Sequence, residues 1–367
     1  MDRYTTLVIV LGTIVSGAMN SILTKYQDMQ CIRHCSDPFR AVYFDQPILQ
    51  TLQMFVGEMF CWIPILISKQ IHSRSRINES VRLVDEDEVM SDKPKWKRST
   101  ALAIPAVCDL LATTLMNFGL LYTPVSIYQM TRGSVILIVG LMSVIFLKKR
   151  ITKLEWISLF VVFLGVFLVG LSGYLEDKKS FKILTTGKDS FDVIIGMFLI
   201  FCGITITAVQ FVIEEHLLAN FKVEPIEVVG YQGFYGALIT FHVMIFGKLL
   251  YGKGYFDIDQ SFEDMFMNKT VFYTSIMIMF SISLFNFCGI TLTKILSATS
   301  RSTIDTSRTL LVWMISLFVG WEKFHNLQLL AFSFLVAGTL AFNGVIQPES
   351  WSIIPEWLKD LELEVPM

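Results

Sequence analysis

The segment that decides the fold is SVIFLKKRITKLEWISLFVVFLG, residues 143–165, because a similar segment, SLFVGWEKFHNLQLLAFSFLVAG, returns 173 residues later. The shift places Ser143 on Ser316, Leu154 on Leu327 and Gly165 on Gly338. A second match joins Leu115-Met116-Asn117-Phe118 to Leu284-Phe285-Asn286-Phe287 at a slightly different offset, as a change in loop length would produce. The chain is therefore predicted to consist of two similar halves.

Apolar runs of about 18 to 25 residues, each long enough to cross a bilayer, recur through the whole chain. Hydrophobic residues make up 53% and charged residues 17% of the 367 residues, and the mean hydropathy is +0.57. These values are typical of a polytopic membrane protein. We predict ten transmembrane helices, at residues 5–24, 47–69, 100–122, 125–147, 154–173, 191–213, 226–250, 270–291, 297–320 and 327–346.

Five spans followed by five similar spans give the two halves opposite orientations in the membrane, as in inverted-repeat secondary transporters. The predicted fold is therefore an all-α integral membrane fold of two inverted five-helix repeats. In such folds the substrate site lies near the membrane midplane, between the halves. The predicted parts are an N-terminal repeat at 1–173 with a cytosolic loop at 70–99, a linker at 174–190, a C-terminal repeat at 191–346 and a cytosolic tail at 347–367.

The orientation follows from the lysines and arginines of alternate loops. More lysines and arginines lie in the loops on the side that carries both termini than on the opposite side. Because loops rich in these residues usually face the cytosol, both termini are predicted to be cytosolic. The first span is interpreted as a retained signal anchor. The net charge of -2 gives no information about partners, and the scattered basic residues do not support nucleic-acid binding.

Arg301, Asp305 and Arg308 concentrate charge within the ninth predicted span, residues 297–320. Offsets of four and seven residues place all three on one stripe of a helix. Ionisable groups at membrane depth are costly, so they normally face a bundle interior or a water-filled cavity and mark a substrate or ion path. The stripe therefore favours a transporter.

Two interpretations of the membrane charges stay open. The whole set sums to zero, so the charges could form buried ion pairs that fix helix register. Alternatively, the arginines face an anionic ligand, because guanidinium suits phosphate. The shift of 173 also maps Arg132 onto Asp305 and predicts that they meet near the bilayer centre. The set comprises Glu58, Asp109, Arg132, Arg301, Asp305 and Arg308.

The cysteines, a glycine triplet and the histidines give smaller signals. Cys31 and Cys35 share the first loop and could form a disulfide or bind metal; a plain thiol pair is favoured because further ligands are missing nearby. Gly230, Gly233 and Gly236 would let a neighbouring helix approach closely. The five histidines are dispersed and form no catalytic motif, so no enzyme, cofactor or metal site is predicted.

Several segments resemble the drug/metabolite transporter superfamily, specifically the nucleotide-sugar-transporter-like proteins of solute carrier family 35, subfamily F. The resemblance implies ten helices, cytosolic termini, alternating access and exchange of a nucleotide sugar or related metabolite across an endomembrane. It also implies that Lys294 attracts phosphate. The resembling segments are 54–58, 105–109, 129–133, 210–215, 286–290, 293–299, 320–322, 328–329 and 342–344.

We therefore predict an endomembrane antiporter for a small anionic metabolite, surrounded by lipid, with a homodimer left open. Vacuolar or lysosomal and Golgi membranes are the predicted locations, with a mitochondrial membrane as an alternative. Glu58 and Asp109 are predicted to couple protons or charge. The alternative is a non-transporting scaffold or receptor that acts through loop 70–99 and the tail. The predicted substrate-binding residues are Arg132, Arg301, Asp305, Arg308, Lys294, Tyr128 and Gln129.

Overall fold

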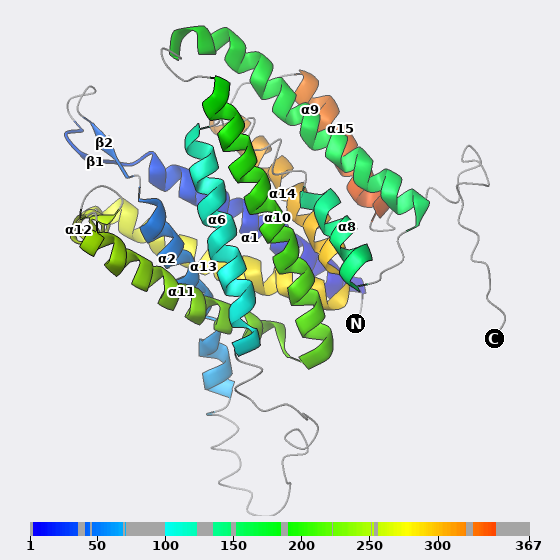
Figure 1. The fold of residues 1–367 in the computed structure, drawn as a ribbon, viewed down its shortest axis with the longest axis horizontal. Coiled ribbons are helices and arrows are strands. Elements are labelled where there is room, and N and C mark those ends of the chain that lie inside the picture. Colours follow the sequence, from blue (N-terminus) through cyan, green and yellow to red (C-terminus); the bar gives the residue numbers. More distant parts are fainter. Residues whose placement is uncertain are drawn as a thin grey trace, which may run out of the picture. The chain divides into compact units, whose positions relative to one another are not determined.

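The computed structural model describes residues 3–35, 41–44, 46–68, 70, 100–122, 135–147, 152–184, 190–221, 223–250, 252, 256–320 and 326–342. Almost all of these residues are helical (Figure 1). In chain order the elements are α1 (Arg3–Asp28), β1 (Cys31–Arg33), β2 (Val42–Tyr43), α2 (Pro47–Met59), α6 (Ala103–Tyr122), α8 (Val135–Leu147), α9 (Lys153–Leu184), α10 (Ser190–Phe221), α11 (Pro225–Leu250), α12 (Ile258–Met267), α13 (Lys269–Ile295), α14 (Ala298–Val319) and α15 (Asn326–Phe342).

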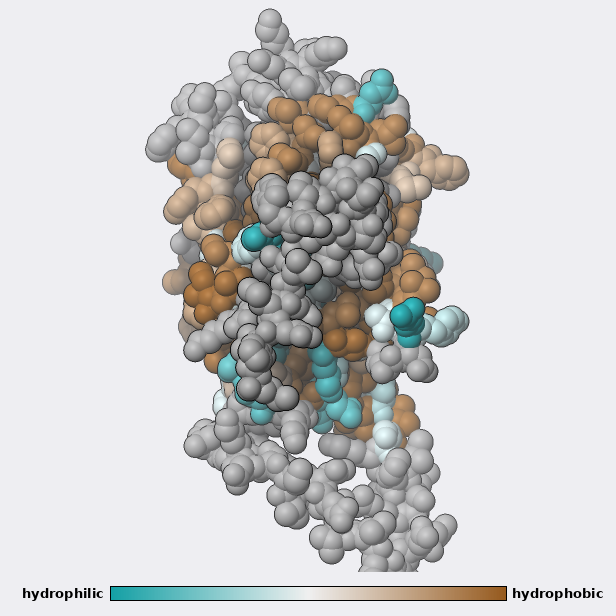
Figure 2. Space-filling view, turned by 90° about the vertical axis from the view of Figure 1, so that its right-hand side faces the viewer, coloured by the Kyte–Doolittle hydropathy of each residue, from teal (hydrophilic) through white to brown (hydrophobic). Residues whose placement is uncertain are grey.

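Each of the ten predicted spans overlaps one of these helices, so the helical membrane fold is confirmed. Within the described residues, five helices are long and apolar enough to cross a membrane, and three more are apolar but shorter. The count of ten spans thus stays a prediction. Large apolar side chains such as Phe198, Phe246 and Phe280 are exposed, and Figure 2 shows many apolar side chains among the coloured residues of the face in view. Such a surface suits lipid rather than water.

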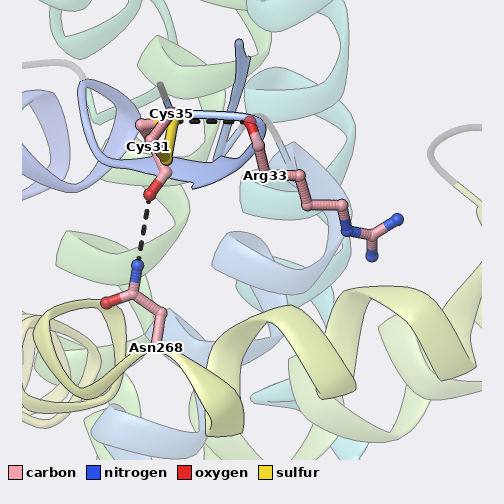
Figure 3. The surroundings of a disulfide bond; sticks show 4 residues. All are labelled: Cys31, Arg33, Cys35 and Asn268. Carbon is pink, nitrogen blue, oxygen red and sulfur yellow. Dashed lines mark hydrogen bonds between the residues drawn. A yellow bond between two sulfur atoms is a disulfide. The ribbon is translucent and has the colours of Figure 1, made fainter. Parts of the chain in front are cut away.

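The sequence predicted neither the β1–β2 hairpin nor the short helix α12. The hairpin is antiparallel, and a disulfide joins Cys31 to Cys35 with their Cα atoms 5.8 Å apart. Asn268 Nδ2 donates to Cys31 O at 3.4 Å (Figure 3), and Arg33 pairs with Asp264 on α12 at 2.5 Å. The cysteines thus form a disulfide, the first of the alternatives that the sequence left open.

Contacts between the helices divide the chain into two compact units. Unit 1 comprises Met1–Leu110 and Ile213–Ile295, and unit 2 comprises Leu111–Val212 and Leu296–Met367. Each unit therefore combines segments from both halves of the sequence, and α6 and α10 contribute to both units. The boundaries of the predicted repeats, 1–173 and 191–346, remain a prediction.

Helices α9 and α15 pack along each other in unit 2 through two glycines that are 173 residues apart. A Cβ at Gly165 would lie 2.8 Å from Ala331 O, and a Cβ at Gly338 would lie 2.9 Å from Ser158 O. Ser158 and Ala331 are also 173 residues apart. The two sides of this contact are therefore equivalent under the repeat, and glycine on each side lets the backbones approach closely.

In unit 1, α2 packs against α11 at the three glycines that share a three-residue spacing. Gly230 faces Trp62, whereas Gly233 and Gly236 face Phe55. A Cβ at Gly233 would lie 2.7 Å from the backbone oxygen of Phe55. The predicted close approach of a neighbouring helix is confirmed.

Candidate functional site

Helix α14 begins at a serine cap and carries the predicted charge stripe. The backbone N–H of Ser300 donates to Ser297 Oγ at 3.1 Å, which satisfies a donor that the first turn of a helix leaves open. Arg301 is 4% exposed and Arg308 is 8% exposed, while Asp305 between them is half-buried. The three charged side chains thus lie on a part of α14 that protein surrounds.

Hydroxyl side chains occupy most of the other positions on this half of α14. Thr303 Oγ1 donates to Thr299 O at 3.1 Å, and Thr306 Oγ1 donates to Ser302 O at 2.8 Å. A hydroxyl side chain on a helix can make its hydrogen bond in this way, to a backbone oxygen of the preceding turn. The charged side chains therefore determine the chemistry of the stripe.

Arg301 lies against an aromatic ring of α10. Its Cζ atom is 4.3 Å from the centroid of the Phe211 ring, within the range of a cation–π contact. Phe211 is itself 9% exposed and packs in an apolar cluster with Val139, Ala208 and Ala298. The sequence did not predict this role for Phe211, because ninety residues separate it from Arg301.

Asp305 and Arg308 form an ion pair on the same helix. Arg308 Nε lies 3.1 Å from Asp305 Oδ1, although the alignment does not make a hydrogen bond at that oxygen. The spacing of three residues puts the two side chains on one face of α14. Asp305 thus offsets the charge of Arg308, and the three side chains of the stripe sum to a formal charge of +1.

Unit 1 holds the carboxylates that were predicted to couple protons or charge. Glu58 on α2 is 2% exposed, and Asn286 Nδ2 of α13 donates to its Oε1 at 2.5 Å. Asp109 is half-buried on α6, next to Cys108. Both residues lie on helices as predicted, and Glu58 is one of the most buried charged side chains of the described chain.

Glu214 is a buried carboxylate that the sequence analysis missed. It is 0% exposed on α10, and Gln232 Nε2 of α11 donates to its Oε1 at 2.8 Å. Cys108 of α6 lies within electrostatic range of both Asp109 and Glu214. The predicted span ended at residue 213, one position before Glu214, whereas α10 continues to Phe221. The apolar run around Leu217 and Leu218 was the signal that could have extended it.

The remaining predicted residues divide into two groups. Lys294 is exposed in the last turn of α13, and its Nζ donates to Val223 O at 3.4 Å. Tyr128, Gln129 and Arg132 lie outside the described residues, as does the predicted contact of Arg132 with Asp305. The structure thus brings Arg301, Asp305 and Arg308 together in unit 2 and places Glu58, Asp109 and Lys294 in unit 1. Within the described ranges, no group of three His, Cys, Asp or Glu side chains could hold a metal ion.

Comparison with protein families places residues 49–171 in the EamA-like transporter family. Uncharacterized protein C12G12.12 of Schizosaccharomyces pombe is 36% identical over 340 residues, which cover 91% of this chain and 96% of that protein. Solute carrier family 35 member F6 is 31% identical in Rattus norvegicus and 30% identical in Homo sapiens. Both matches cover 91% of this chain, and 87% and 88% of the respective relatives.

A solved crystal structure shares the fold. It aligns with 95% of this chain over its own full length, with a TM-score of 0.60 at 12% identity. Identity this low supports the fold and nothing further. The close relatives and the fold likeness cover nearly the whole chain.

Proposed function

Since this chain belongs to solute carrier family 35, within the EamA-like transporters, we propose that it is a secondary transporter for a small anionic metabolite. It exchanges its cargo for a counter-substrate or couples it to protons, by alternating access across an endomembrane. The cargo we propose is a nucleotide sugar or a related nucleotide-linked solute.

The observation that carries this proposal is the buried charge on α14. Arg301 and Arg308 are less than a tenth exposed in a membrane protein, where an arginine is costly and normally serves a function. Guanidinium offers a planar fork of donors that matches a phosphate or carboxylate. The two arginines and Asp305 give the stripe a formal charge of +1, which suits an anion.

The other proposed roles surround this stripe. Arg132, Tyr128 and Gln129 would complete the substrate contacts, and Lys294 would attract phosphate at the cytosolic mouth. Glu58 and Asp109 would carry the coupled proton or charge. Carboxylates suit this role, since a change in their surroundings changes how readily they bind a proton.

The disulfide supports the proposed orientation. Disulfides persist in oxidising compartments and are rare in the cytosol. The Cys31–Cys35 bond therefore favours a luminal or external side for the loop between α1 and α2. With α1 crossing the membrane, the N-terminus would be cytosolic. We propose a vacuolar, lysosomal or Golgi membrane, with a mitochondrial membrane as the alternative.

The proposal is tested by ligand-dependent thermal stability of the purified protein in detergent. A ligand at 100 times its Kd stabilises the folded state by about 2.7 kcal/mol. The ligands would be nucleotide sugars, nucleotides, dicarboxylates and amino acids. We expect a selective shift of the melting temperature with nucleotide-linked anions, lost in the Arg301→Gln variant.

A second outcome separates the proposal from the scaffold alternative. If no anion shifts the melting temperature and the arginine variants retain cellular function, the transporter hypothesis is wrong. A scaffold would instead lose function when loop 70–99 is deleted.

A further inference from the structure

The short helix α12, which lies between α11 and α13 in the chain (Figure 1), turns a polar side toward the protein. Ser261 and Asp264 on this side are 1% and 7% exposed. Ser261 Oγ donates to Gln46 Oε1 at 2.8 Å, and Asp264 pairs with Arg33 of the hairpin. These contacts fix which way the rest of the helix faces, because the side chains of a helix point outward at about 100° per residue.

One exposed flank of α12 is acidic. Asp259 and Glu263 lie one helical turn apart, and the side chain of Asp259 is 81% exposed. Lys248 Nζ, near the end of α11, lies 2.6 Å from Asp259 Oδ2. Exposed charged groups need water or polar headgroups around them, because their transfer to an apolar medium is costly. The acidic flank therefore lies at the level of headgroups and water.

The flank beside it is aromatic and continues onto α13. The rings of Phe262 and Phe266 stack with their centroids 6.3 Å apart, and the ring of Phe272 on α13 lies 5.8 Å from that of Phe266. Tyr273 makes an edge contact with Phe272 at 5.8 Å. Phe266 is 60% exposed and Tyr273 is 64% exposed. We call these four residues the aromatic patch.

Capping hydrogen bonds hold α12 in this orientation. Asp257 Oδ1 accepts from the backbone N–H of Gln260 at 3.2 Å, which caps the first turn of α12. Asn268 alone separates α12 from α13, and its Oδ1 accepts from the backbone N–H of Thr270 at 3.0 Å. The backbone of Asn268 is extended, so the chain turns between the two helices. The aromatic patch thus spans a fixed corner of unit 1.

The neighbouring membrane helix identifies lipid as the partner of the patch. Tyr273, Met277 and Phe280 lie at offsets of four and seven on one face of α13, and all three are exposed. The patch is therefore continuous with an apolar face of a helix that is long enough to cross the membrane. Aromatic side chains are enriched where a membrane meets water, and amphipathic helices lie in this zone with their apolar face among the acyl chains.

A protein partner fits the patch less well. A fully buried aromatic side chain contributes about 150–250 Å². The four rings of the patch already cover one another in part, so together they fall short of the roughly 800 Å² that each partner buries in a specific protein interface. Contact with lipid requires no such minimum area.

We infer that α12 is an interfacial helix whose aromatic patch lies among lipid acyl chains, while its acidic flank faces headgroups and water. It lies on the side of the membrane that carries the disulfide, because Asp264 pairs with Arg33 of the hairpin. The segment between the predicted spans 226–250 and 270–291 is thus part of the membrane-embedded structure. This inference is independent of the transported cargo.

The test replaces Phe266 with the photoreactive amino acid p-benzoylphenylalanine by nonsense suppression. The purified full-length protein is reconstituted in phosphatidylcholine vesicles and irradiated, and mass spectrometry of its peptides measures covalently attached phosphatidylcholine. We expect about fivefold more lipid adduct at Phe266 than at Glu263, because only the apolar flank of an interfacial helix reaches the acyl chains.

The same replacement at other positions provides the controls. Glu263, three residues before Phe266 on the acidic flank, is the matched control. Phe280, which is 67% exposed on α13, is the positive control and should give lipid adduct. Tyr273 is a second probe of the patch if the Phe266 variant does not fold, which the melting temperature of each variant in detergent shows.

Three results would overturn the inference. Lipid adduct at Phe280 but at neither Phe266 nor Tyr273 would show that α12 lies in water. Equal adduct at Glu263 and Phe266 would show that no boundary between lipid and water runs along the helix. A cross-link from the patch to a second copy of the chain, seen at twice the mass, would make the patch a protein interface.

Discussion

Unit 1 and unit 2 hold buried charge in opposite ways. Among the described residues of unit 1, the long helices α2 and α10 bury the carboxylates Glu58 and Glu214, and each accepts a hydrogen bond from a neutral amide on another helix; Asp264 on the short helix α12 pairs with Arg33 instead. In unit 2, α14 buries Arg301 and Arg308, and each is held by a ring or a carboxylate. An amide tolerates both the protonated and the ionised form of its partner, whereas arginine stays charged. The carboxylates of α2 and α10 and the arginines of α14 are thus held by different kinds of partner, and variants of these partners test the contrast.

The largest expected effect comes from breaking the ion pair of unit 2. Asp305→Ala removes the carboxylate that lies 3.1 Å from the buried Arg308, and breaking a buried pair from one side costs about 3–5 kcal/mol. Asp305 is 18% exposed, so we expect the lower end of that range. Thermal unfolding in detergent measures the loss.

The double variant Asp305→Leu/Arg308→Met is the control for this pair. It removes both charges and should recover much of the lost stability. If the double variant is as unstable as Asp305→Ala, packing rather than charge holds this part of α14.

A smaller effect is expected from the amide partners of unit 1. Asn286→Leu removes the donor to Glu58, and a hydrogen bond to a charged group contributes about 1.5–3 kcal/mol. Gln232→Leu is the matched variant for Glu214 and should cost a similar amount. Equal melting temperatures for wild type and both variants would contradict the contrast between the units.

The disulfide gives a comparable or slightly smaller effect that is confined to unit 1. Cys31→Ser/Cys35→Ser opens a five-residue loop, for which chain entropy predicts a loss of about 2 kcal/mol. A reducing agent should lower the melting temperature of the wild type by the same amount and leave the variant unchanged. Cys202→Ser, at a free cysteine on α10, serves as the control.

The smallest effect is expected at an exposed ion pair of unit 1. Lys248 Nζ lies 2.6 Å from Asp259 Oδ2, but the aspartate side chain is 81% exposed. Exposed pairs contribute about 0–1 kcal/mol because water screens them. Lys248→Ala should therefore shift the melting temperature by less than any variant above, and a larger shift would show that distance outweighs burial here.

The helices could be predicted from the sequence because length and hydropathy are local properties. Each predicted span overlaps a helix, and the offset of 173 reappears in the two equivalent contacts of Gly165 with Ala331 and of Gly338 with Ser158. The predicted end of the sixth span was less accurate, since α10 continues beyond Glu214. In a sequence, a charged residue such as Glu214 indicates the end of a transmembrane span. Only the structure shows that its side chain is buried and that the helix continues.

By itself, the sequence determined the membrane class, the helices and the positions of Arg301, Asp305 and Arg308 on one stripe. Apolar runs and the helical period are properties of a single segment, so they can be read without knowing which segments pack together. Only the tertiary structure decided which groups meet. Phe211 lies ninety residues before Arg301, and Gln232 lies eighteen residues after Glu214 on another helix. Such pairs depend on how whole helices pack against each other. A contact between two helices produces no regular spacing of residues in the sequence, so it could not be predicted from the sequence.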